Sequence, residues 1–390
     1  MISVEAALAQ LLALVRPLDV EYVPLRHAAS RVLAHDVTAT RTQPPFAASS
    51  MDGYALRRAE VEPDAMFKVI GEAAAGHRFE GQLRVGQAVR IFTGAPVPQG
   101  ADFVVIQEDV TRRGDLITLG HRVGTKDNIR PAGGDFEAGQ TVKAPLRLRP
   151  ADIALLAAMN IADVPVTSRP RVAILATGDE LVQPGETPGP DQIIASNSFG
   201  LAAMLENLGA QVQMLPIARD TVASLKQAFR LAQGADLIIT IGGASVGDHD
   251  LVAPVASEMG MEQAFYKVAM RPGKPLMAGR MGDAVMIGLP GNPVSAMVSG
   301  TVFAGPVVRK MLGLAEDAPQ MHQAPLARAL PANGPRAHYM RARIKDGALH
   351  PDDRQDSSLL SVLATADALL VRPVDDPARA TGEMVDYIPI

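Results

Sequence analysis

The chain has 390 residues, of which 47% are hydrophobic and 20% charged, so it has the composition of a folded protein with several domains. Its formal net charge of −5 disfavours binding to nucleic acid, and the absence of cysteine excludes disulfides, thiolate metal sites and cysteine nucleophiles. Tryptophan is absent and aromatic residues make up only 4% of the chain, which disfavours a surface for stacking single-stranded bases.

The first residues predict an amphipathic helix. In MISVEAALAQLLALV, Leu8, Leu11, Leu12 and Val15 recur at helical spacing, and Glu5 without a basic residue disfavours a signal peptide. Because no uncharged run reaches the ~18 residues needed to span a bilayer, we expect a cytoplasmic protein that does not enter the membrane.

Two regions of different texture follow. Residues 46–137 contain short β-type runs such as QAVRIFTGA and ADFVVIQEDV between glycine-rich turns, and predict an inserted β domain. Residues 138–168 contain the helical run ADIALLAAMNI, which we expect to pack with the first helix. Residues 1–45 and 138–168 are therefore assigned to one discontinuous N-terminal domain of mixed helical and extended structure.

The remaining chain is predicted to form an α/β domain over residues 169–317 and a C-terminal β domain over 318–390. In the former, the strands RVAILATG, QVQMLPIARD, ADLIITIGG and AVMIGLPG alternate with helices, the second of which, TVASLKQAFRLAQG, has Asp220 as its expected cap. This alternation predicts a doubly wound parallel sheet, so the expected fold class is multidomain α/β plus β.

Unusual loops follow the predicted parallel strands, at the sheet edge where such folds bind ligands. In TIGGASVGDHD, Gly242, Gly243, Ser245 and Gly247 suit an anion. Asp248 and Asp250 face the same side if the backbone is extended, and would attract Mg²⁺. The alternative is a glycine turn with Asp250 capping the next helix.

Neighbouring loops add further charges. Glu180 and Asp220 each fit a cap or a turn, but several acids at one sheet edge favour a cation or a catalytic function. Lys267, Arg271 and Lys274 lie within KVAMRPGK, where the prolines favour extended backbone; a polyanion pocket and a solvated loop are the two interpretations.

The other candidate segments are less specific. In GLPGNPVS, Pro293 suits a first helical position, and this helix start fits either an anion or plain packing. In the inserted β domain, Asp52 follows hydroxyl residues, Thr93 lies in a turn, and Arg130 precedes Asp135 by five residues. Since no GxSxG motif or triad order is present, the residues favour metal-assisted transfer on a phosphorylated substrate over serine catalysis.

Nine ordered motifs across roughly residues 45–300 resemble the MoeA family, which includes molybdopterin molybdenumtransferases and the gephyrin E domain. They are SSMDGYA, TGAPVP, VVIQEDV, IRPAGGDF, TGDELV, SNS, GGASVGDHD, RPGKP and GLPGNPVSA. The resemblance implies an enzyme that inserts molybdenum from molybdate into adenylylated molybdopterin and releases AMP, with Mg²⁺ as cofactor.

The same resemblance implies roles for individual residues. The positions linked to activity are Asp52, Thr93, Glu180, Asp220 and Asp250, with Asp220, Asp248 and Asp250 as metal ligands. The implied substrate-binding residues are Arg130, Asp135, Gly242, Gly243, Ser245, Gly247, Lys267, Arg271, Lys274, Pro290, Pro293, Arg336 and Ser357. Arg271 stands where the family commonly has lysine. The positive charge is kept, but the compact ammonium group is replaced by a planar guanidinium with several donors.

The resemblance further implies an elongated homodimer, with each site between the α/β domain of one subunit and the β domain of the other. The adenylyltransferase and the acceptor molybdoenzymes are the implied partners. Two alternatives are a molybdopterin adenylyltransferase, which shares the α/β domain but lacks the DGYA-bearing region and the last domain, and a non-enzymatic scaffold like gephyrin.

Overall fold

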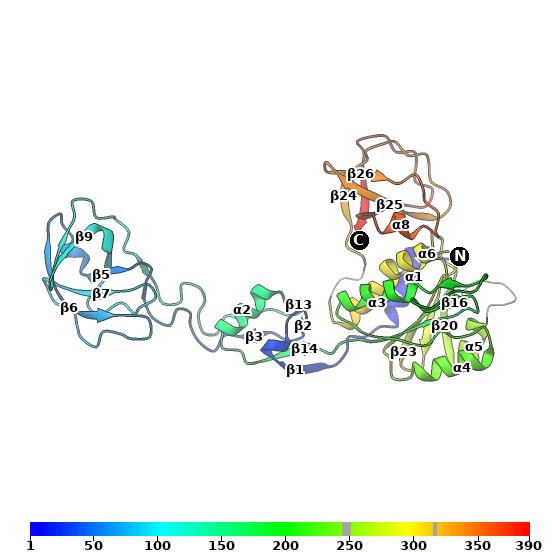
Figure 1. Cartoon of the computed structure of the whole chain (residues 1–390), viewed down its shortest axis with the longest axis horizontal. Coiled ribbons are helices and arrows are strands. Elements are labelled where there is room, and N and C mark those ends of the chain that lie inside the picture. The colour runs from blue at the N-terminus through cyan, green and yellow to red at the C-terminus, as the bar shows by residue number, and fades with distance from the viewer. Residues whose placement is uncertain (244–250, 315–317) are drawn as a thin grey trace.

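The chain is elongated and consists of four units (Figure 1). The computed structural model describes residues 1–243, 251–314 and 318–390. A β unit lies at one end, a small mixed unit follows, and an α/β unit lies at the other end beside a C-terminal unit of strands. The predicted fold class is thus confirmed. No helix in the described part of the chain combines the length and apolar character needed to cross a membrane.

The α/β unit contains a sheet of strand order β18-β15-β19-β23-β22-β20. Its strands are β15 (Arg171–Ala176), β18 (Gln211–Met214), β19 (Leu237–Ile241), β20 (Met261–Tyr266), β22 (Met277–Met281) and β23 (Ala284–Leu289). β18, β15, β19 and β23 run parallel, and β22 runs antiparallel to both β23 and β20. The carboxyl end of β20 therefore lies at the same edge as those of the parallel strands.

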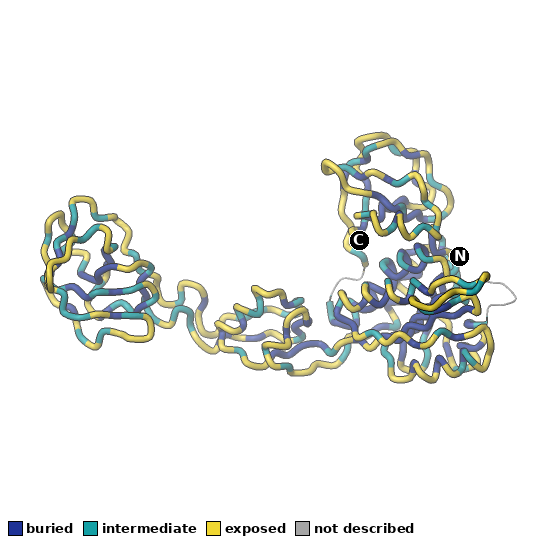
Figure 2. Tube along the Cα trace, in the orientation of Figure 1, coloured by how far each residue is buried: buried dark blue, intermediate teal, exposed yellow. Residues whose placement is uncertain are grey.

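Apolar side chains cover both faces of this sheet, as the continuous apolar runs of β15 and β19 require. The helices are α3 (Asn197–Asn207), α4 (Val222–Leu231), α5 (Val252–Glu258), α6 (Pro293–Ser299) and α7 (Gly305–Met311). One core contains residues of α3, α6 and α7, and the other contains residues of α4 and α5. Between α6 and α7 the helix continues as a π-helical segment, Gly300–Ala304. Figure 2 shows the resulting concentration of buried residues.

The first helix, α1 (Val4–Ala13), begins at Ser3, whose hydroxyl accepts a hydrogen bond from the backbone N–H of Ala6. Its apolar face packs in the core of the α/β unit, against α7 and β20. The helix of residues 150–158, α2 (Pro150–Ala158), packs instead in the mixed unit. The expectation that these two helices pack together is therefore wrong. An amphipathic pattern shows that a helix buries one face, but it does not identify the partner.

The mixed unit connects the two ends of the molecule. Its strands are β1 (Val20–Pro24), β2 (Val32–Leu33), β3 (Val37–Thr38), β12 (Thr141–Val142), β13 (Leu146–Arg147) and β14 (Asp163–Thr167). β1 and β14 form an antiparallel ribbon that leads directly to the α/β unit. The N–H of Leu18 donates to the carbonyl of Met311 at 2.8 Å, which fixes one end of this ribbon to α7.

The β unit is a sheet of order β8-β5-β7-β6-β10-β9 beside the pair β11-β4. Its strands are β4 (Ala48–Ser49), β5 (Gly53–Leu56), β6 (Met66–Ala73), β7 (Gln87–Ile91), β8 (Phe103–Ile106), β9 (Val110–Arg113), β10 (Leu116–Leu119) and β11 (Ile129–Arg130). Tyr54, Phe67 and Phe103 are among the residues that form its core.

The C-terminal unit is joined to the α/β unit through a shared sheet. Its elements are β24 (His322–Pro325), β25 (Ala337–Lys345), β26 (Ala348–Pro351), α8 (Leu360–Leu363), β27 (Ala368–Arg372) and β28 (Met384–Pro389). The short strand β21 (Met270–Arg271), which follows β20, pairs in parallel with β25. The segment 267–275, which carries Lys267, Arg271 and Lys274 and is called the cationic loop below, thus lies at the junction of the two units.

Candidate active site

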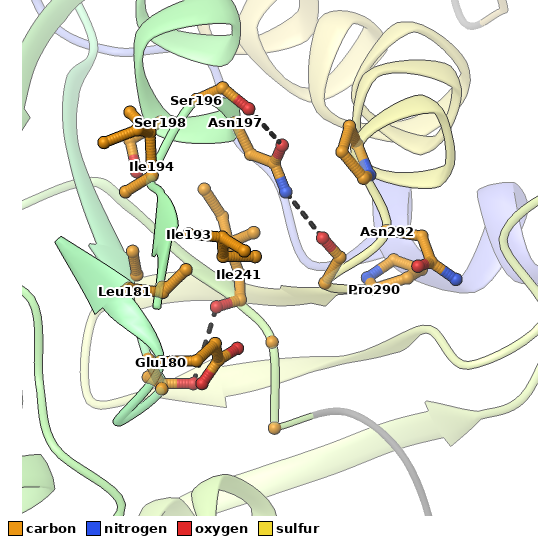
Figure 3. A pocket seen from close by; sticks show the side chains of 18 of the residues that line it. Glu180, Leu181, Ile193, Ile194, Ser196, Asn197, Ser198, Ile241, Pro290 and Asn292 are labelled. Atoms are coloured by element: carbon orange, nitrogen blue, oxygen red, sulfur yellow. Dashed lines mark hydrogen bonds between the residues drawn. The ribbon is translucent and has the colours of Figure 1, made fainter. Parts of the chain in front are cut away.

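A cavity of about 630 Å³ opens at the carboxyl edge of the α/β sheet (Figure 3). Glu180 follows β15, Asp220 follows β18, Gly242 and Gly243 follow β19, and Pro290 follows β23; all of them line the cavity. The strand topology therefore brings together residues that are more than a hundred positions apart in the sequence.

Part of the cavity wall is apolar. It includes the short parallel pair β16 (Leu181–Val182) and β17 (Ile193–Ile194). Ile193 and Ile194 line the cavity although both are exposed to solvent, and Leu181 lies beside them. The N–H of Ile193 donates to the carbonyl of Glu180 at 2.8 Å, so the cavity offers an apolar surface next to a carboxylate.

Gly242 and Gly243 adopt backbone angles that favour glycine, with φ of +90° and +60°. A Cβ at Gly242 would lie 2.8 Å from the carbonyl oxygen of Thr177, and one at Gly243 would lie 2.3 Å from Cγ2 of Val252. The glycine pair therefore meets both a conformational and a packing requirement. The N–H of Gly242 donates to the carbonyl of Leu289 at 3.1 Å, which extends the contact with β23 beyond the end of β19.

Asn197 connects the start of α3 to the turn after β23. Its Nδ2 donates to the carbonyl of Gly291 at 2.7 Å, and its Oδ1 accepts from the hydroxyl of Ser196 at 3.3 Å (Figure 3). Both residues line the cavity, yet neither was identified individually from the sequence. The signal was the SNS motif, which contributed to the family resemblance but not to the set of candidate residues.

The turns that carry the acids contact each other. The N–H of Asp220 donates to Oδ1 of Asp179 at 3.4 Å, and Nη1 of Arg219 donates to the carbonyl of Asp179 at 2.9 Å. The cap of α4 is Thr221, whose hydroxyl accepts from the N–H of Ser224 at 3.2 Å. The expectation that Asp220 caps this helix is wrong, because Thr221 has the extended backbone angles of the N-cap.

The metal prediction rests partly on residues for which no structure is given. Ser245, Gly247, Asp248 and Asp250 lie outside the described residues. Across the described ranges, no three or more histidine or acidic side chains are arranged to hold a metal ion. The cavity-lining carboxylates among the described residues are Glu180 and Asp220.

The cationic loop borders the cavity through Pro275, which lines it. The loop is closed by two hydrogen bonds, from the N–H of Lys267 to the carbonyl of Leu276 at 2.9 Å and from the N–H of Val268 to the carbonyl of Lys274 at 3.1 Å. The ammonium of Lys267 lies 5.1 Å from the centre of the Tyr266 ring. Neither Lys267 nor Lys274 is among the residues that line the cavity.

Arg271 lies opposite His338 in the pairing of β21 with β25. Burial, which is the largest cause, and the positive charges of Arg271, Arg341, Arg372 and Arg336 together lower the pKa of His338 to about 4. This histidine is therefore neutral at physiological pH, and Arg271 and Arg336 supply charge at the junction of the two units.

Ser357, from the C-terminal unit, contacts the start of α6. Its carbonyl accepts a hydrogen bond from the N–H of Val294 at 2.9 Å. Pro293, the first residue of α6, has no backbone N–H. The N–H of Val294 is therefore the first backbone donor of this helix, and it is bonded to Ser357. One donor at the start of α6 is thus engaged by protein, while Pro290, Gly291, Asn292 and Pro293 of the same turn line the cavity.

Asp52 and Thr93 form a second, separate group. Oδ1 of Asp52 accepts hydrogen bonds from both the backbone N–H and the hydroxyl of Thr93, each at 2.8 Å. The two hydrogen bonds from Thr93 lower the pKa of Asp52. The positive charge of Arg90 lowers this pKa as well, whereas desolvation raises it, and the net shift is downward. Asp52 is consequently a fixed carboxylate acceptor at neutral pH.

The group lies far from the cavity within one chain, because the β unit and the α/β unit occupy opposite ends of the molecule (Figure 1). Arg130 is exposed in β11, and the N–H of Asp135 donates to the carbonyl of Gln43 at 3.1 Å. The predicted site residues therefore fall into two sets, one on the β unit and its connection and one around the cavity.

Fold and cavity together define a multidomain protein built around an α/β domain with a ligand-sized cavity at the carboxyl edge of its sheet. Three family models match in order: the "MoeA N-terminal region (domain I and II)" over residues 2–160, the "Probable molybdopterin binding domain" over 173–310 and the "MoeA C-terminal region (domain IV)" over 323–390. The chain belongs to the MoeA family.

Individual relatives resemble the chain over most of its length. It is 38% identical over 300 residues to a molybdopterin molybdenumtransferase of Haemophilus influenzae, covering 76% of this chain and 74% of that protein. It is 35% identical to the protein of that name from Nostoc sp., covering 94% and 83%. The structure of a molybdopterin biosynthesis moeA protein from Pyrococcus horikoshii superposes with a TM-score of 0.85 at 27% identity, over all of both chains.

Proposed function

We propose that this protein is a molybdopterin molybdenumtransferase, which inserts molybdenum from molybdate into adenylylated molybdopterin and releases AMP. The observation that carries the proposal is the cavity, where a glycine pair, two carboxylates and an apolar wall meet beside a cationic loop. Relatives that carry this enzyme name, and that are similar to this protein over most of its chain, support the proposal.

The cavity suits a ligand that is part phosphate and part flat heterocycle. Gly242 and Gly243 line the cavity directly after β19, and the turn that follows a parallel strand is where such folds commonly bind phosphate groups. Ile193 and Ile194 provide an apolar surface against which a ring can lie. Asn197 links the start of α3, which follows β17, to the turn after β23 through its hydrogen bond to Gly291.

The carboxylates fit Mg²⁺, which binds one or two carboxylates and completes its coordination with water and substrate oxygens. Glu180 and Asp220 are the described candidates, and Asp248 and Asp250 remain sequence predictions. When bound, Mg²⁺ would stabilise the negative charge that develops on the phosphate of the departing AMP. A carboxylate that does not bind the metal is suited to orient the water that cleaves the phosphate bond.

Molybdate is a dianion and requires positive charge near the cavity. Arg271 and Arg336 bring permanent charge to the junction with the C-terminal unit, and Lys274 lies on the same loop as Arg271. We assign molybdate or the terminal phosphate to this cationic region, next to Ser357.

We further propose that the site is completed by a second subunit, since Asp52 and Thr93 lie at the far end of their own chain. A symmetric dimer would place the β unit of one subunit beside the cavity of the other. Mixing Asp52→Ala with Glu180→Ala chains tests this arrangement. If subunits share sites, random exchange restores about one quarter of wild-type activity, because half of the dimers contain one intact site; a site within one chain gives none.

The main test is AMP release from adenylylated molybdopterin by purified protein. We expect release that requires both molybdate and Mg²⁺ and that stops when EDTA removes the metal. No release under any of these conditions would refute the proposal. Formation of adenylylated molybdopterin from ATP and molybdopterin would instead favour the adenylyltransferase, although the matches over residues 2–160 and 323–390 extend well beyond its shared domain.

A further inference from the structure

A loop of the C-terminal unit, residues 352–358, reaches the cavity. Ser358 lines the cavity, and the carbonyl of Ser357 accepts the hydrogen bond from Val294 at the start of α6. The 352–358 loop is therefore the segment by which the C-terminal unit touches both the cavity and the helix beside it.

Two side chains attach this loop to β25. Nη2 of Arg341 donates to the carbonyls of Arg354 and Asp356, at 3.3 and 2.9 Å. Gln355 reaches back, because its Oε1 accepts from the N–H of Arg341 and its Nε2 donates to the carbonyl of Arg341, both at 3.0 Å. Nε2 of Gln355 also donates to the carbonyl of Asp352 at 2.8 Å, within the loop itself.

The end of the 352–358 loop is held by hydrogen bonds between its own residues. The carboxylate of Asp356 accepts the backbone N–H of Ser358 at 2.8 Å and its hydroxyl at 2.6 Å. The position of the Ser358 side chain therefore depends on Asp356, whose own carbonyl is held by Arg341.

Stability alone does not account for a guanidinium at this position. Arg341 is 0% exposed, and its Nε and Nη1 have no hydrogen-bond partner among the described residues. Burying a charge with unpaired donors is costly, and an apolar side chain of similar volume is often as stable or more stable. What only a hydrogen-bond donor can supply at this position is the connection to the two loop carbonyls.

We propose that Arg341, together with Gln355, is a positioning residue that holds the 352–358 loop so that Ser358 forms part of the substrate-binding wall. Arg341 does not line the cavity and acts through the loop. The consequence for the reaction rests on the proposed function, whereas the consequence for the loop does not.

The variants are Arg341→Met, which removes the donors, and Arg341→Lys, which keeps one charged donor group. Lys345→Met is the matched control, because Lys345 lies on the same strand and is exposed, and it lies opposite Ala348 of β26 rather than the 352–358 loop. Gln355→Ala is a second route to the same loosening, for use if Arg341→Met does not fold.

Amide hydrogen exchange measures the loop directly. In Arg341→Met, we expect the amides of Val294 and Ser358 to exchange at least about tenfold faster, while Leu370 in the neighbouring β27 keeps its protection. Lys345→Met should leave all three unchanged. The inference is overturned if Val294 and Ser358 keep wild-type protection, or if Leu370 loses protection equally, since the latter indicates general unfolding of the unit.

Kinetics measure the effect on the reaction. For Arg341→Met we expect the KM for adenylylated molybdopterin to rise about tenfold with kcat within about twofold, and Arg341→Lys to recover part of the loss. A fall in kcat at unchanged KM would overturn the proposal, because loss of folded enzyme has that signature. If the wild-type protein shows no transfer, the proposed function fails, and the exchange experiment still decides whether Arg341 positions the loop.

Discussion

Replacing Gly243 with alanine should lower the free energy of unfolding of the α/β unit by more than backbone strain alone would. Its φ of +60° costs an ordinary L residue about 1–2 kcal/mol. The new Cβ would also lie 2.3 Å from Cγ2 of Val252, which is 1% exposed, and such overpacking typically costs about 1–3 kcal/mol. The expected total is about 2–5 kcal/mol.

Gly282→Ala is the matched control. Gly282 lies in the turn between β22 and β23 and also has a φ of +60°, but nothing lies within 4 Å of the position of its Cβ. This variant should therefore lose only the backbone contribution of about 1–2 kcal/mol. The difference between the two variants isolates the steric contact with Val252.

The assay is native-state hydrogen exchange of Ile239 in β19, together with AMP release. Gly243→Ala should accelerate the exchange of Ile239 by about thirtyfold or more and slow AMP release, since the displaced turn lines the cavity. Gly282→Ala should retain wild-type turnover. Equal effects of both variants on exchange would refute the reasoning, because they would show that Val252 yields at no cost.

Three further predictions concern the outlying units. Gly53→Ala should separate β5 from β8, because a Cβ there would lie 1.8 Å from the carbonyl oxygen of Val105; retained exchange protection in β8 would contradict this. Thr93→Val removes one donor to Asp52 and should raise the carboxyl pKa toward its usual value, as measured by NMR titration; an unchanged titration would show that the hydroxyl contributes nothing. Asp376 is 5% exposed, and although burial opposes its ionisation, hydrogen bonds from Arg379 and Arg372 lower its pKa. Its contribution to stability is therefore complete above the unfolded pKa of about 3.9 and is lost as the pH falls through the lower folded value. Asp376→Asn should remove this acid dependence and cost roughly 3 kcal/mol, as measured by urea unfolding of the C-terminal unit across pH; a variant with wild-type acid dependence would contradict the assignment.

Local pattern was enough to predict the parallel part of the α/β sheet, but not the strand β22, which runs antiparallel to its neighbours. β15 and β19 are continuous apolar runs, and strands that alternate with helices form parallel sheets whose loops collect at one edge. Glu180, Asp220, Gly242 and Gly243 were therefore placed at a common site from the sequence, and the structure brings all four to one cavity. The family resemblance followed from the same loops, and the family models confirm it.

Other features depend on contacts that no local pattern records. Arg341 in HYMRARI resembles the other charges of a surface strand, yet it is wholly buried because the 352–358 loop folds over it. Val294 and Ser357 are over sixty positions apart, and only their contact shows that the start of α6 is engaged by protein.

By itself, the sequence determined the fold class, the edge of the sheet that carries the site and the chemical types of residue gathered there. These properties follow from periodicity, glycine and proline positions, and charge, which act over a few residues. Only the tertiary structure decided that α1 packs in the α/β unit, that Asp52 lies far from Glu180 in one chain, and that Arg341 holds a cavity loop. Each of these depends on packing between segments distant in the sequence, which the free energy of the whole fold selects.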